Sequence, residues 1–213
     1  MRRLRTLNSF GRIGIGGQPW GWRGGGGDAA GVVCPVVDTF TDVDGTLLLA
    51  HTPDVDILGG GWDGGGIITG DKARIGVGAP SISLIDSGMS DMVLEATLTK
   101  DAGGVSQQIG LIIRSNALST AFVYVRYIFL GFNDMRIVHG PDNTDYVVQP
   151  VAWPAGGTGT IRVEASGTLI SVYLNDVFVV STVTADELAE MHQGLWGFLG
   201  NYDADDFSVC PFP

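Results

Sequence analysis

The sequence predicts an all-β protein in which two antiparallel sheets pack face to face as a sandwich. Short apolar runs recur from Val36 onward, and turn-forming residues separate them roughly every 8 to 12 residues, a spacing typical of sandwich strands. Only residues 185–191, with Asp186, Glu187 and Glu190, have a helical pattern, and this segment is short. So little helix argues against alternating strand–helix–strand units.

The individual strands are predicted from alternation and from turn chemistry. In residues 92–99 and 161–165 every second side chain is apolar, which is the period of a strand with one buried face. Ser166-Gly167 and Asn175-Asp176 have the composition of hairpin turns. Further apolar runs predict strands at 108–114, 121–129, 135–139, 146–149, 169–174 and 177–183.

Length and composition restrict the class of protein. The chain has 213 residues, of which 45% are hydrophobic and 16% charged, so it suits one large domain, alone or with an appendage, and is not expected to be disordered. No apolar run approaches the roughly 18 residues of a membrane span, and the best candidate, 121–132, contains Arg126. The basic start lacks an apolar stretch behind it, so no secretory signal is expected.

Residues 1–33 differ in composition from the rest and predict an extended arm. They contain ten Gly and five Arg against Asp28 alone, a charge of +4, whereas residues 34–213 carry −15 of the total −11. Glycine at this density cannot build a core of its own. We expect the arm to order by docking on partner proteins, with folding back onto its own domain as the alternative. The expected anchors are its Arg and Trp side chains: Arg2, Arg3, Arg5, Arg12, Trp20, Trp22 and Arg23.

Residues 36–210 resemble a known family of folds. The segments 38–47 and 51–54, followed by Trp62, are similar to the opening of concanavalin A-like (laminin G-like) jelly rolls of phage and bacterial surface proteins. Residues 110–114 resemble the central buried strand of that family, and its last three strands resemble 175–179, 194–198 and 205–209. The resemblance implies a lectin- or glucanase-type jelly roll over residues 34–213 and does not include the arm.

The same resemblance implies structural roles for particular residues. It implies that Trp62 and Trp196 are core tryptophans, and that Asp205-Asp206 caps the entry to a strand. It also implies that the first and last strands pair antiparallel, which would bring Cys34 and Cys210 together. A disulfide is then one alternative. We favour two free thiols, because a reducing cytoplasm does not promote oxidation.

The residues that catalysis needs are not clustered. Sandwich glycanases use paired carboxylates, yet the four Glu residues are isolated or lie in the short helical segment, and the three His residues are scattered without metal-ligand spacing. The glycine runs lack the Lys-Ser/Thr continuation of a phosphate loop. The sequence therefore predicts a non-enzymatic protein without a cofactor.

Carbohydrate and calcium binding are the remaining site hypotheses. An aromatic platform beside acid and amide groups is typical of sugar sites, and the nearest candidates are Trp62, Asp63, Asn201, Tyr202 and Asp203. Asp203, Asp205 and Asp206 supply oxygen ligands of the kind that Ca²⁺ takes.

The leading functional interpretation is a structural protein of a tailed-phage virion. It would be a head decoration protein or a tail appendage, anchored to other virion proteins by the arm, displaying the sandwich outward and forming a homo-oligomer. A nucleic acid is not an expected partner, since the domain is acidic, and no membrane partner is expected because no apolar run is long enough to span one. The alternative is a carbohydrate-binding adhesion module that meets a host-surface glycan, and a glycoside hydrolase is the least favoured reading.

Overall fold

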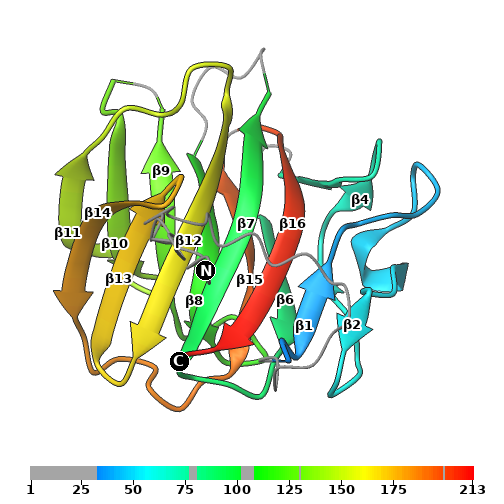
Figure 1. Cartoon of the computed structure of the whole chain (residues 1–213), viewed down its shortest axis with the longest axis horizontal. Coiled ribbons are helices and arrows are strands. Elements are labelled where there is room, and N and C mark those ends of the chain that lie inside the picture. Colours follow the sequence, from blue (N-terminus) through cyan, green and yellow to red (C-terminus); the bar gives the residue numbers. More distant parts are fainter. Residues whose placement is uncertain (1–32, 77–80, 102–107, 130, 199) are drawn as a thin grey trace, which may run out of the picture. The chain divides into compact units, whose positions relative to one another are not determined.

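The computed structural model describes residues 33–76, 81–101, 108–129, 131–198 and 200–213, and within them two antiparallel sheets face each other (Figure 1). The predicted all-β sandwich is therefore confirmed. Sheet A follows the order β14 (Val177–Val183), β13 (Leu169–Leu174), β12 (Thr158–Ser166), β7 (Met92–Lys100), β16 (Tyr202–Pro211), β1 (Val36–Asp38) and β2 (Val55–Asp56).

Two short strands extend sheet A beside β1, with β5 (Ala73–Ile75) paired to β16 and β4 (Ile67–Ile68) paired to β5. A single turn of 3-10 helix, Leu48–Ala50, precedes β2. Sheet B follows the order β11 (Thr144–Pro150), β10 (Asp134–His139), β9 (Phe122–Ile128), β8 (Gln108–Ser115), β15 (His192–Phe198), β6 (Ser81–Asp86) and β3 (Asp63–Gly64).

The main hydrophobic core lies between the two sheets and is built from alternating residues. In β7 the buried positions Met92, Leu94, Ala96 and Leu98 alternate with partly exposed ones, which confirms the predicted half-buried strand. A fully buried Met or Leu side chain contributes roughly 1.5–3 kcal/mol to folding. The alternation therefore fixes which face of each strand points inward.

The predicted helix at 185–191 does not form. The chain makes a turn there, with Glu190 N–H donating to the Glu187 carbonyl. Glu187 itself has a φ of 57°, a left-handed conformation that cannot continue a right-handed helix. The segment is thus a connection between β14 and β15.

In the part of the chain that the structure describes, no helix is long and apolar enough to span a membrane.

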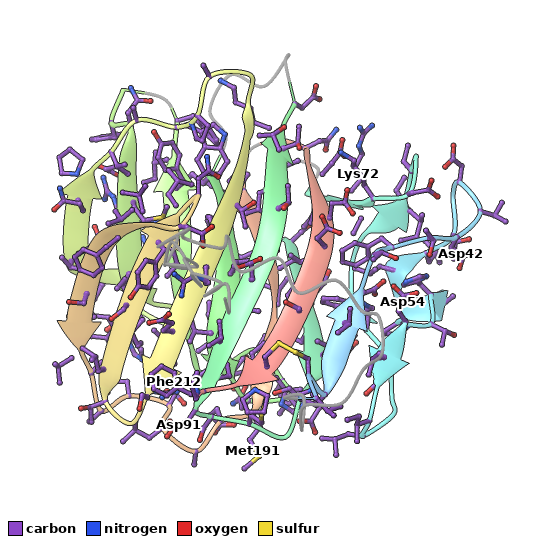
Figure 2. All side chains as sticks on the ribbon, in the orientation of Figure 1. Asp42, Asp54, Lys72, Asp91, Met191 and Phe212 are labelled. Atoms are coloured by element: carbon purple, nitrogen blue, oxygen red, sulfur yellow. A yellow bond between two sulfur atoms is a disulfide. The ribbon has the colours of Figure 1, made fainter. Side chains whose placement is uncertain are left out.

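The first and last strands pair antiparallel, as the resemblance implied. Val36 lies opposite Val209, so the residues next to these strands meet at the same edge. Cys34 and Cys210 are joined there by a disulfide, with their Cα atoms 4.1 Å apart and a sequence separation of 176. The yellow sulfur–sulfur bond in Figure 2 lies beside the end of β16. The expectation of free thiols is corrected, because strand pairing brings the two side chains within bonding distance.

A buried polar cluster holds the long connection after β1. The indole Nε1 of Trp62 donates to Asp38 Oδ2 at 2.6 Å, and His51 Nε2 lies 2.9 Å from Asp38 Oδ1. Trp62 also packs edge-on against Phe207, with ring centroids 4.9 Å apart. The predicted core role of Trp62 is confirmed, since only 2% of this residue is exposed.

Candidate functional site

Sheet B carries polar and aromatic side chains on the face that points away from the core. Because Val123, Val125 and Tyr127 of β9 pack between the sheets, the alternate residues Tyr124 and Arg126 face the opposite way. This outer face is the candidate site.

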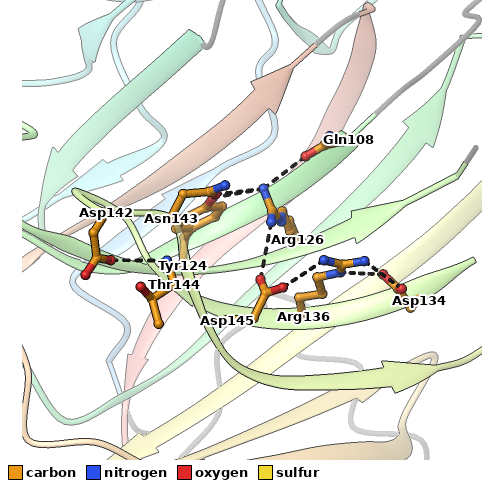
Figure 3. Close-up of polar contacts among 9 residues, drawn as sticks. All are labelled: Gln108, Tyr124, Arg126, Asp134, Arg136, Asp142, Asn143, Thr144 and Asp145. Carbon is orange, nitrogen blue, oxygen red and sulfur yellow. Dashed lines mark hydrogen bonds and ion pairs between the residues drawn. The ribbon is translucent and has the colours of Figure 1, made fainter. Parts of the chain in front are cut away.

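Arg126 is the centre of a hydrogen-bond network on the outer face. Its Nη1 donates to Gln108 Oε1 at 3.2 Å, to Tyr124 Oη at 3.3 Å and to Asn143 Oδ1 at 3.0 Å (Figure 3). Its Nη2 donates to Asp145 Oδ1 at 3.3 Å. The Arg126 Nε is buried without a hydrogen-bond partner among the described residues, so one N–H of the guanidinium is unused.

A second arginine balances the charge of the network. Arg136 donates to both carboxylate oxygens of Asp134, at 2.8 and 3.0 Å, and to Asp145 Oδ2 at 2.7 Å (Figure 3). These carboxylates, Asp134 first, raise the pKa of Arg136. Two guanidinium groups thus meet two carboxylates, and the network has no net charge.

Aromatic and aliphatic side chains lie beside the network on the same face. The rings of Tyr124 and Trp196 are 4.8 Å apart, and burial raises the pKa of the Tyr124 hydroxyl. Trp196 is buried as expected, but it belongs to this second cluster rather than to the core between the sheets. The cluster consists of Leu84, Ile112, Phe122, Tyr124, Val138 and Trp196.

The exposed part of the network is the turn between β10 and β11. Asn143 is exposed and the side chain of Asp145 is 26% exposed, whereas that of Arg126 is only 8% exposed. Asn143 takes a φ of 56°, which asparagine tolerates better than most residues, and Tyr124 Oη donates to its Oδ1 at 2.9 Å. Solvent therefore reaches the amide and carboxylate of the network from the turn.

An open groove begins where the network ends. Phe132 is 64% exposed, and the Arg136 Cζ lies 5.2 Å from the centroid of its ring. Phe132 also lines a groove of about 890 Å³, together with Phe129, Asn133 and Trp153. Exposed aromatic surface and hydrogen-bonding groups are thus contiguous here.

The residues predicted to bind carbohydrate do not form such a surface. Trp62 and Tyr202 are 2% and 1% exposed, so neither ring can stack on a ligand, and this prediction is corrected. Asp203 accepts two hydrogen bonds from Arg74, at 2.8 and 3.1 Å. Asp63 lies in sheet B, whereas Asn201 precedes β16 of sheet A. Side chains alternate between the two faces of a strand, and Tyr202 lies on the face of β16 that packs on the core.

Basic side chains already pair with two of the carboxylates that were predicted to bind calcium. Arg74 holds Asp203, and Lys72 Nζ lies 3.9 Å from Asp205 Oδ2. Among the described residues no three His, Cys, Asp or Glu side chains are grouped so as to hold a metal ion.

The residues of the N-terminal arm that were predicted to anchor it to partner proteins lie outside the described residues: Arg2, Arg3, Arg5, Arg12, Trp20, Trp22 and Arg23.

The two carboxylates of the Arg126 network accept hydrogen bonds from arginine. A glycoside hydrolase needs one carboxyl that donates a proton and a second that attacks or activates water. Asp134 and Asp145 instead both accept hydrogen bonds from Arg136. Burial raises the pKa of Glu95, but Glu95 lies on sheet A opposite Arg162, away from the outer face of sheet B.

Comparisons with known proteins identify the fold. No protein-family model and no curated protein matches the sequence. The carbohydrate binding module CBM66 from Bacillus subtilis superposes with a TM-score of 0.64 at 15% identity, covering 70% of this chain and 94% of that one. The Bacillus licheniformis β-glucanase superposes with a TM-score of 0.56 at 9% identity, covering 83% of this chain and 97% of that one.

A third similar structure is a Bacillus subtilis protein of unknown function with a galectin-like fold, with a TM-score of 0.55 at 8% identity, covering 70% of this chain and 87% of that one. At these identities the likeness concerns the fold alone. The chain therefore has the concanavalin A-like, galectin-like jelly-roll β-sandwich fold.

Proposed function

We propose that this protein is a non-catalytic carbohydrate-binding β-sandwich that holds a sugar on the outer face of sheet B, at Arg126, Asn143 and Asp145. The observation that carries the proposal is the Arg126 network: a guanidinium bound to an amide, a carboxylate and a phenol that meet at an exposed turn. Sugar hydroxyls donate and accept hydrogen bonds at once, so they match a site that offers both kinds of group.

The charge balance indicates the kind of sugar. Arg126 and Arg136 are neutralised by Asp134 and Asp145, and residues 34–213 carry a net charge of −15. An anionic glycan would be repelled by such a domain. The proposed ligand is therefore a neutral glycan, and the exposed ring of Phe132 offers an apolar surface on which a sugar ring can stack.

Two of the similar structures support the ligand class by their names, since one is a carbohydrate binding module and the other a β-glucanase. The paired acceptor carboxylates favour binding over hydrolysis. Incubation with the bound polysaccharide should release no reducing ends, and release that a Glu→Gln variant abolishes would instead establish a hydrolase.

The experiment is a glycan array followed by titration calorimetry of the full chain with the neutral glycan that scores highest. Asn143→Ala should weaken binding about tenfold or more, because a hydrogen bond within a charged network is worth about 1.5–3 kcal/mol. Asp63→Asn is the matched control, as Asp63 is an exposed residue at the edge of the same sheet. Loss of affinity in Asp63→Asn with none in Asn143→Ala would reject the site.

A place on a tailed-phage particle is the finer proposal, and the composition of residues 1–33 supports it. Ten Gly and five Arg in that segment suit a chain that orders against a partner. Deleting residues 1–33 should abolish attachment to particles and leave the melting temperature of the sandwich unchanged. A truncated protein that still binds particles would contradict this role.

A further inference from the structure

We propose that the glycan is an extended chain rather than a single terminal sugar, and that its further units lie in the groove lined by Phe129, Phe132 and Trp153. This inference rests on the proposed sugar site and names the form of glycan that the site takes. Three segments line the groove: the end of β7, the turn between β9 and β10, and the connection from β11 to β12. Figure 1 shows that β7 ends and β12 begins at the same end of the sandwich.

The proposed sugar site and the groove lie at opposite ends of β10. His139 pairs with Thr144, which puts the turn that carries Asn143 at one end of the strand. Asp134 pairs with Pro150, and Pro150 lines the groove at the other end. The six residues of β10 span about 17 Å in extended conformation, so one sugar ring cannot contact Asn143 and the groove at once.

The Arg126 network connects the two ends. Asp145 accepts hydrogen bonds from both Arg126 and Arg136. Arg136 also donates to Asp134, and its Cζ lies 5.2 Å from the centroid of the Phe132 ring. Hydrogen-bonding groups therefore line the path from the turn to the groove, and a glycan chain bound at the turn has a route along β10.

The groove itself has the surface chemistry of a sugar site. Its aromatic rings, among them Phe132 with 64% exposure, offer apolar surface on which sugar rings can stack. The Lys100 ammonium, 5.1 Å from the centroid of the Phe129 ring, supplies hydrogen-bond donors for sugar hydroxyls. No Asp or Glu is found among the described residues that line the groove, so its chemistry differs from that of the acidic domain around it.

The aromatic floor of the groove is held in place by packing. The Tyr127 ring lies 4.7 Å from that of Phe129 and 4.8 Å from that of Trp153, and its hydroxyl donates to the Val151 carbonyl at 2.7 Å. Gly159 leaves room for the indole, since a Cβ there would lie only 3.1 Å from Trp153 Cζ2. A preformed surface loses less conformational entropy when a ligand binds.

The groove continues beyond the space that one sugar ring needs. It shares Pro150, Val151, Ala152 and Pro154 with a second groove of about 400 Å³, which reaches Phe178 of β14. Sites that enclose a whole small ligand typically measure about 300–1,000 Å³, and the first groove alone has about 890 Å³. This continuity suits a chain that passes the end of the sandwich.

The first experiment measures affinity against chain length. The probes are oligosaccharides of one to six units, cut from the neutral glycan that scores highest on the array, and they are titrated into the full chain by calorimetry. The hexasaccharide should bind at least about tenfold more tightly than the disaccharide, equivalent to about 1.4 kcal/mol. Asn143→Ala should weaken the binding of both.

Phe132→Ala separates the groove from the sugar site at the turn. The affinity for the hexasaccharide should fall to nearly that for the disaccharide, and the affinity for the disaccharide should stay unchanged, which also shows that the variant is folded. Phe212→Ala is the matched control, because Phe212 is an exposed phenylalanine that lines neither groove. It should bind both probes like the wild type.

Lysine labelling reports on the groove directly. The chain has two lysines, Lys72 and Lys100, and Lys100 lines the groove, whereas Lys72 lies beside Asp205 of β16. Acylation followed by peptide mass spectrometry should show that the hexasaccharide slows the modification of Lys100 several-fold and leaves that of Lys72 unchanged. The disaccharide should protect neither lysine.

The possible failures are distinguishable. An affinity that does not depend on chain length, equal losses for both probes in Phe132→Ala, or a Lys100 that the hexasaccharide leaves unprotected would each overturn the extended-chain inference and leave the sugar site at the turn intact. An array without any neutral glycan bound, or an Asn143→Ala variant that binds both probes like the wild type, would overturn the proposed site and this inference together.

Discussion

Arg126 and Arg136 lie directly opposite each other on the neighbouring strands β9 and β10. Two like charges in this position repel, and the structure offsets the repulsion with Asp145, whose two oxygens accept from one arginine each, at 3.3 and 2.7 Å. The carboxylate thus has a structural task in addition to its place in the proposed sugar site.

Replacing Asp145 by Asn should therefore lower the free energy of unfolding by about 1–2 kcal/mol. This is at the lower end of the usual range for hydrogen bonds to charged groups, because the side chain is partly exposed. The loss should shrink at high salt, which screens the two guanidinium groups from each other. Urea unfolding at low and high ionic strength measures both effects. Asp63→Asn serves as the control, and equal losses in the two variants at every salt concentration would contradict this account.

His51 predicts a pH dependence of stability. Burial alone lowers the pKa of His51, but hydrogen bonds and charges from Asp38 and Asp42 outweigh it, so the pKa is raised above 6.5. Since the folded protein binds the proton more tightly than the unfolded chain, this stabilisation is fully present below the unfolded pKa and is lost as pH rises through the folded value.

The measurement is the free energy of unfolding between pH 5.5 and 8.5, a range chosen to bracket the usual histidine pKa of about 6.5. The difference between wild type and His51→Gln should be largest at the acidic end and decrease as pH rises. A difference that grows with pH would show that His51 is held neutral in the folded protein.

The disulfide predicts a measurable redox effect. Cys34 and Cys210 close a loop of nearly the whole domain, and in the chain-entropy model such a crosslink contributes about 5 kcal/mol. The intact mass should rise by two hydrogen atoms on reduction, and the Cys34→Ser, Cys210→Ser double variant should melt at a lower temperature. An unchanged mass, or equal melting temperatures, would mean that the thiols are free in solution.

The sequence was informative where one face of a strand is polar and the other apolar. Met92, Leu94, Ala96 and Leu98 alternate with partly exposed positions, three of which are polar, so both the strand and its buried face could be predicted. The strands β2, β3 and β4 have two residues each, too few for any periodicity. They form because their neighbours in the sheet hold them.

The candidate site could not be predicted in the same way. Residues 122–128 are buried on both faces, so alternation does not reveal that Tyr124 and Arg126 point outward. The available signal was Arg126 itself, a charge within an apolar run that needs partners when buried. Those partners, Gln108, Asn143 and Asp145, lie 17 to 19 residues away in sequence, and only the pairing of β8, β9, β10 and β11 brings them together.

Tyr124 tests whether the network positions the Asn143 amide, which we propose binds the sugar. Its hydroxyl accepts from Arg126 Nη1 at 3.3 Å and donates to Asn143 Oδ1 at 2.9 Å, so it orients a side chain that solvent reaches. Tyr124→Phe keeps the ring that packs on Trp196 and removes these two bonds. The free energy of unfolding should fall by about 1 kcal/mol, and glycan affinity should fall several-fold.

Calorimetry of the single variants and of the Tyr124→Phe, Asn143→Ala double variant separates positioning from direct contact. If Tyr124 acts only through Asn143, the double variant should bind no more weakly than Asn143→Ala alone. Additive losses in the double variant would mean that the Tyr124 hydroxyl contacts the sugar itself, and unchanged affinity in Tyr124→Phe would mean that the orientation of Asn143 does not limit binding.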